Sequence, residues 1–166
     1  MANRTEGEIL AEAYESVRGL SKFYISKIDK IDVNKSIEVD GVSFNSAYWI
    51  LAHLVWTEHF LLIEGLGGKL MDIPWLKEYK IGSDMNKIKQ KPPVKEILKK
   101  MDEVHSAAVT NIKGLTDEQM DEPNHVDATF GGVNSKRNII KHAIRHEPMH
   151  IGQLSWILKA HGVKMV

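Results

Sequence analysis

Apolar residues recur at three- and four-residue spacing in separate stretches of the chain, which is the pattern of α-helices with one buried face. In the first stretch this spacing joins Ile9, Ala13, Val17, Leu20 and Tyr24. The second stretch is apolar on nearly all sides, which indicates a helix buried in the core. We therefore predict long helices over residues 5–28, 44–65, 93–114 and 135–161.

Turn and capping signals divide these stretches. Thr5 and Glu8 have the spacing of a capping box, and Asn134 or Ser135 is a suitable cap for the last helix. Nearly thirty residues join the second and third stretches, and a connection of this length usually carries short structure or lines a site. Alternation over residues 36–42 is too short to start a sheet. The fold class we predict is all-α, a four-helix bundle with at least one long crossover.

Length and composition narrow the class of protein further. A chain of 166 residues predicts one domain over residues 1–166, and 22 basic against 22 acidic residues give no net charge. This balance gives no reason to expect nucleic acid or an anionic membrane as a partner. No apolar run reaches the length of a membrane span and the first residues do not resemble a secretory signal, so we expect a cytoplasmic protein. Because cysteine is absent, any thiol chemistry would need an external thiol.

The segment with the most chemical information is His146-Glu147-Pro148-Met149-His150. Two histidines four residues apart on a helix lie on the same side, so both rings can reach one ion. Both also fall beside apolar positions of the last helix, where buried imidazoles are costly unless they are hydrogen-bonded or metal-bound. Hydrogen-bonded core histidines are the alternative interpretation.

His53 lies in the middle of the most apolar helix, with Thr57 on the same side. Since this helix is apolar all round, its periodicity does not show which way His53 points, and a hydrogen-bonded core histidine is again the alternative. His105 is centred on the apolar side of the third helix, where it is either a core residue or a fourth ligand.

Two other metal motifs fit less well. His146-Glu147-x-x-His150 matches the zincin pattern, but Pro148 interrupts it and no carboxylate ligand follows. A ferritin-like di-metal site would need a second Glu-x-x-His helix and two more inward carboxylates, and only Asp102-x-x-His105 is a half-match.

Two segments resemble the DinB/YfiT-like metalloenzyme family: Ala52-His53-Leu54 in the second helix, and residues 145–154, RHEPMHIGQL, in the last. The resemblance extends over essentially the whole chain. It implies a bundle of up-down-down-up topology that forms a homodimer. It also implies that His53, His146 and His150 bind a divalent metal, with Thr57, Glu147 and Gln153 beside these ligands.

Histidine ligands suit zinc, nickel, iron or copper, and ligand identity alone does not choose among them. Some members of the family are thiol-dependent S-transferases, so the resemblance implies a small-molecule electrophile as substrate and an external low-molecular-weight thiol as co-substrate. A non-catalytic, stress-related bundle whose metal site is structural or vestigial is the alternative function.

Overall fold

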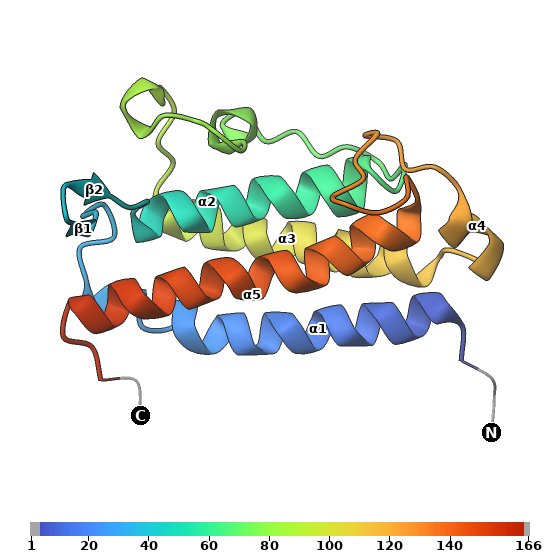
Figure 1. The fold of residues 1–166 in the computed structure, drawn as a ribbon, viewed down its shortest axis with the longest axis horizontal. Helices are drawn as coiled ribbons and strands as arrows, with labels where there is room; N and C mark the ends of the chain where they lie inside the picture. Colours follow the sequence, from blue (N-terminus) through green and yellow to red (C-terminus); the bar gives the residue numbers. More distant parts are fainter. Residues whose placement is uncertain (1–3, 165–166) are drawn as a thin grey trace.

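Four long helices dominate the computed structural model, which describes residues 4–164 (Figure 1). They are α1 (Glu6–Ile25), α2 (Ala47–Glu58), α3 (Val94–Lys113) and α5 (Lys136–Ala160). Each lies within one of the four predicted ranges, and the all-α class is confirmed. Within the described residues, no helix combines the length and the apolar character needed to cross a membrane.

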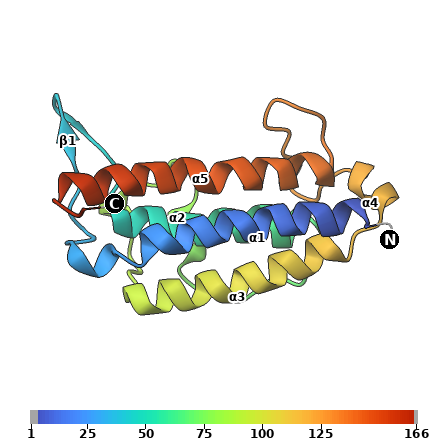
Figure 2. The ribbon, with the colours of Figure 1, turned by 90° about the horizontal axis from the view of Figure 1, so that it is seen from below.

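Each long helix packs against two others. α1 contacts α3 and α5, and α2 contacts the same two helices from the other side. Figures 1 and 2 show α1 and α5 running in one direction along the bundle, and α2 and α3 in the opposite direction. The chain between α2 and α3 also packs on α2. Nearly every residue of α2 is therefore buried, as its apolar sequence predicts.

Short elements fill the connections. After α1 come η1 (Ile28–Lys30) and an antiparallel hairpin of β1 (Glu38–Val39) and β2 (Val42–Ser43), which pair only with each other among residues 4–164. A π-helical turn, η2 (His59–Glu64), extends α2, and the crossover to α3 carries η3 (Leu76–Tyr79) and η4 (Met85–Lys87). Finally, α4 (Asp117–Asp121) precedes α5. The long crossover therefore carries short structure of its own, as expected.

Side-chain caps define where the helices begin. Thr5 and Glu8 form the predicted capping box at α1, and Ser135 caps α5 by accepting from the Asn138 amide. Ser46 caps α2 in the same way. Helix α5 runs through Pro148 without a break in the helix, so this proline does not separate the two histidines on either side of it.

The face that α1 buries is not the one the sequence pattern predicted. Ile9 and Leu20 are each 52% exposed. The buried face consists of Gly7, Ala11, Tyr14, Arg18, Ser21 and Ile25. The prediction was wrong because the buried face carries a charge and several small residues, which make it less apolar than the outward face. Arg18 is nonetheless buried because two buried carboxylates bind it.

Gly7 lies where α1 passes close to the end of α3. A β-carbon added at Gly7 would stand 2.6 Å from the carbonyl oxygen of Ile112 and 3.1 Å from that of Leu115. We expect Gly7→Ala to lower the free energy of unfolding by about 1–3 kcal/mol, because the two backbones must separate. Urea denaturation measures this change.

Gly19→Ala is the matched control in the same helix. A β-carbon at Gly19 meets no other atom within 4 Å. Alanine favours the helix over glycine, so this variant should gain up to about 1 kcal/mol. Equal gains in both variants would contradict the close contact between α1 and α3.

Candidate metal centre

Three histidines meet between α2 and α5. His53 comes from α2, and His146 and His150 come from successive turns of α5. Each offers one ring nitrogen, and these three nitrogens lie within 4.8 Å of one another. The Nε2 atoms of His146 and His150 are 3.2 Å apart. Two nitrogens bound to one tetrahedral zinc ion at ~2.0–2.1 Å would be separated by about 3.3 Å, so the spacing of this pair fits a shared ion.

Hydrogen bonds fix which nitrogen of two of the rings carries the proton. Nδ1 of His53 lies 2.8 Å from the backbone oxygen of Tyr79. Nδ1 of His150 lies 2.9 Å from Oε1 of Gln153. Because a carbonyl oxygen only accepts, each Nδ1 donates, and the lone pair of each ring is left on Nε2. This is the arrangement in which a neutral histidine serves as a metal ligand.

Neighbouring side chains hold the His53 ring in place. The indole of Trp49 stacks on it at 4.4 Å between ring centres, with 12° between the ring planes. The indole nitrogen of Trp49 donates in turn to Ser83 in the crossover. The Thr57 hydroxyl donates to Nε2 of His53 at 3.2 Å, so Thr57 lies directly beside the lone pair that an ion would use. The crossover between α2 and α3 thus lines the site.

Burial keeps the three rings neutral. It lowers the pKa of His53 from 6.5 to about 4. For His146 burial acts first and the nearby histidines add to it, so that its pKa falls to about 3. Burial lowers the pKa of His150 as well, although the hydrogen bond that its Nδ1 donates to Gln153 acts in the opposite direction. Their lone pairs are therefore available to an ion without the release of a proton at neutral pH.

Of the residues predicted beside the ligands, Thr57 and Gln153 contact the rings, whereas the Glu147 carboxylate binds elsewhere. Its two oxygens accept from Arg18 at 2.9 Å and 3.0 Å, and one also accepts from Ser21 at 2.5 Å. A carboxylate held in this way by α1 does not provide the general base of a zincin peptidase. The chain therefore shares with the zincin motif the spacing of the two histidines, but not the role of the glutamate.

A buried network of charged residues lies next to the cluster, and the sequence analysis did not predict it. Arg18 also donates to Glu58 at 2.7 Å, and Nδ1 of His105 lies 2.8 Å from the other oxygen of Glu58. Arg18, Glu58 and Glu147 are each 3% exposed. The only signals in the sequence were charged residues within apolar helices, Glu58 above all.

Three further histidines, on α3, η2 and α5, lie outside the group of three. His105, a candidate fourth ligand from the sequence, contacts Glu58 instead. His59 accepts a hydrogen bond from the Met71 amide at 3.1 Å. The ring of His142 stacks on Phe130 at 3.7 Å. Within residues 4–164 the structure therefore gathers three histidines, and no carboxylate belongs to the group.

The fold and this site define a four-helix bundle with three converging histidines in its interior. A family model described as the DinB superfamily matches residues 25–154. The chain belongs to the DinB superfamily, as the sequence resemblance implied. No curated protein and no solved structure matches the chain.

Proposed function

We propose that the chain is a metal-dependent enzyme that binds one divalent ion through His53, His146 and His150 and joins an external thiol to a small electrophile: the thiol gives up its proton to solvent, and the new carbon–sulfur bond forms as the electrophile's bond to its leaving group breaks. The observation that carries the proposal is the convergence of three neutral imidazoles whose nitrogens lie within 4.8 Å of one another. A donor set of three imidazoles favours zinc, nickel or iron over magnesium or calcium, which prefer oxygen ligands.

Three protein ligands leave open positions for a reactant, which is the arrangement of catalytic rather than structural metal sites. An ion bound there would lower the pKa of a coordinated thiol or water, so that a nucleophile forms near neutral pH. The protein itself orients the rings through the Tyr79 carbonyl and the Gln153 amide. Since the chain has no cysteine, the thiol must come from a second substrate.

Metal stoichiometry tests the ligand set. We expect the purified protein to bind one Zn²⁺ or Ni²⁺ per chain, and His53→Ala to abolish this binding because only two imidazoles remain. His142→Ala is the control. His142 lies one turn before His146, but its ring stacks on Phe130 and is not one of the three converging rings. Elemental analysis after dialysis, with circular dichroism to confirm folding, makes the comparison. Equal metal content in the two variants would contradict the assignment.

A thiol-consumption assay separates the enzyme from the alternative of a structural or vestigial metal site. The protein is supplied with a low-molecular-weight thiol and an electrophile, with and without metal. Loss of thiol that needs both the metal and His53 supports the transferase. Stoichiometric metal binding without thiol loss, across several thiols and electrophiles, would favour the non-catalytic bundle.

A further inference from the structure

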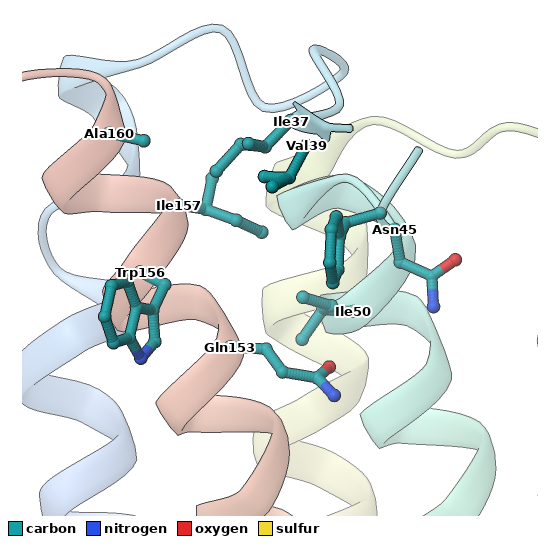
Figure 3. Close-up of a pocket in the computed structure, with 9 residues that line it drawn as sticks. Ile37, Val39, Asn45, Ile50, Gln153, Trp156, Ile157 and Ala160 are labelled. Atoms are coloured by element: carbon teal, nitrogen blue, oxygen red, sulfur yellow. The ribbon is translucent and has the colours of Figure 1, made fainter. Parts of the chain in front are cut away.

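The structure contains a cavity of about 490 Å³, and its lining includes Ile50 and Gln153, two residues near the histidine cluster in sequence (Figure 3). It is formed where the hairpin region meets the beginning of α2 and the end of α5. Its walls are mostly apolar and include Ile37, Val39, Phe44, Ile50, Trp156 and Ile157. The volume falls within the roughly 300–1,000 Å³ that is usual for small-molecule sites.

Two residues connect the cavity with the cluster. Ile50 precedes His53 by three residues on α2, and Gln153 follows His150 by three residues on α5, so each lies about one turn away. Gln153 lines the cavity and also accepts the hydrogen bond from Nδ1 of His150. Because this bond uses the amide oxygen, the two N–H groups of Gln153 stay available to a ligand in the cavity.

We propose that this cavity binds the electrophilic substrate, and that this substrate is an uncharged, largely apolar molecule with one acceptor group directed at Gln153. No charged side chain lines the cavity among the described residues. An ionised ligand would therefore find no charged partner in the wall to compensate for any hydration that it loses. That this ligand is a substrate rests on the proposed function. The chemistry of the ligand rests on the cavity itself.

The uncharged lining of the cavity places the two reactants on different sides of the histidines. Low-molecular-weight thiols such as glutathione carry several charges, so the apolar cavity does not suit them. The thiol reaches the histidines from outside the cavity, and the electrophile lies along Ile50 and Gln153. Substitutions in the cavity wall should therefore affect the electrophile and leave the thiol unchanged.

Binding of an uncharged aromatic probe, N-phenyl-1-naphthylamine, tests the cavity without metal, in chelator-treated protein. Its fluorescence rises in apolar surroundings. Val39→Asp places a carboxylate in the wall, and because Val39 is 51% exposed on the hairpin the fold should tolerate it. We expect this variant to bind the probe at least about tenfold more weakly, a loss of about 1.4 kcal/mol. Val133→Asp is the control, since Val133 is 74% exposed and lies outside the cavity.

A second variant, Ala160→Trp, fills the cavity from the exposed end of α5 and should also weaken probe binding. Both cavity variants should keep full metal stoichiometry. In the thiol assay they should raise the KM of an uncharged aromatic electrophile by about tenfold and leave the KM of the thiol unchanged.

Equal probe binding by Val39→Asp, Ala160→Trp and Val133→Asp would overturn the proposal. Probe binding that is lost on self-association, followed by sedimentation velocity, would assign the cavity to a second copy of the chain and would also overturn it. Intact, cavity-dependent probe binding in a protein that takes up no metal would instead overturn the proposed function alone.

Discussion

Replacing Arg18 with leucine is expected to lower the free energy of unfolding by about 3–5 kcal/mol, the usual cost of removing one partner from a buried ion pair. The guanidinium of Arg18 donates to both oxygens of Glu147 and to Glu58. Leucine fills part of the space but donates no hydrogen bond. Two carboxylates would then remain buried without the cation that compensates them.

The pH dependence of this loss has a definite sign. Burial by itself would raise the pKa of Glu58, but Arg18 and then His105 outweigh it, so that its pKa lies below the usual 4.5. Without Arg18 the effect of burial prevails and the pKa of Glu58 should rise above 4.5. The deficit of Arg18→Leu relative to the wild type should therefore be largest at neutral pH, and should shrink as the pH falls through the raised pKa. Urea denaturation of both proteins at about pH 7.5 and about pH 5 measures it.

Two controls show whether the loss comes from the buried charges. Lys22 lies one turn further along α1 and pairs with Asp102 at 3.1 Å, but its side chain is 61% exposed. Lys22→Ala should cost less than about 1 kcal/mol. The triple variant Arg18→Leu, Glu58→Gln, Glu147→Gln should recover much of the stability, because no net charge stays buried. A loss for Arg18→Leu no larger than that for Lys22→Ala would contradict this account of the network.

This network also explains why the sequence predicted where the helices lie better than it predicted which face of α1 is buried. The apolar positions of α3 and α5 repeat with helical spacing, and Ile97, Met101 and Ile139 are buried as that spacing requires. On α1 the rule failed because the partners of Arg18 lie 40 and 129 residues away in sequence. A pattern within one helix carries no information about a charge that a distant segment compensates.

In the candidate site, too, the features set within one helix could be predicted from the sequence, and those set by distant segments could not. The spacing of His146 and His150 on one helix showed that both could reach one point, and their Nε2 atoms are 3.2 Å apart. The direction of His53 could not be predicted because α2 is apolar on all sides. It is set by the carbonyl of Tyr79, 26 residues further along the chain. The cavity could not be predicted from the sequence either, because it is formed only where the hairpin region meets the end of α5.

Adding Zn²⁺ or Ni²⁺ at about a hundredfold excess over its dissociation constant should stabilise the protein by about 2.7 kcal/mol, because the ion binds the folded chain and not the unfolded one. For a chain of this length each kcal/mol shifts Tm by roughly 2–4 °C. We therefore expect a rise of about 5–10 °C over chelator-treated protein at neutral pH. His53→Ala should show no such rise.

Acid should lower the stability of the metal-free protein. In the unfolded chain these histidines take up protons near the usual 6.5, whereas burial holds the folded-state pKa of His53 at about 4 and, with help from the other histidines, that of His146 at about 3. A lowered folded-state pKa means that the unfolded state binds more protons below pH 6.5, so stability is lost as the pH falls from there towards 4. For His53 alone the shift corresponds to something on the order of 3 kcal/mol.

The effect of metal should nevertheless persist in mild acid. At about pH 5.5 the rings of His53 and His146 are still neutral in the folded protein, so protons compete with the ion at these two ligands less than they would at exposed imidazoles. Thermal melts at about pH 7.5 and about pH 5.5, each with metal and with chelator, separate the two effects: both Tm values should fall in acid, while a clear difference between metal and chelator remains. If metal leaves Tm unchanged at pH 7.5 across a wide range of concentrations, the three histidines are ordinary core residues, and the buried lone pairs on Nε2 bind no ion.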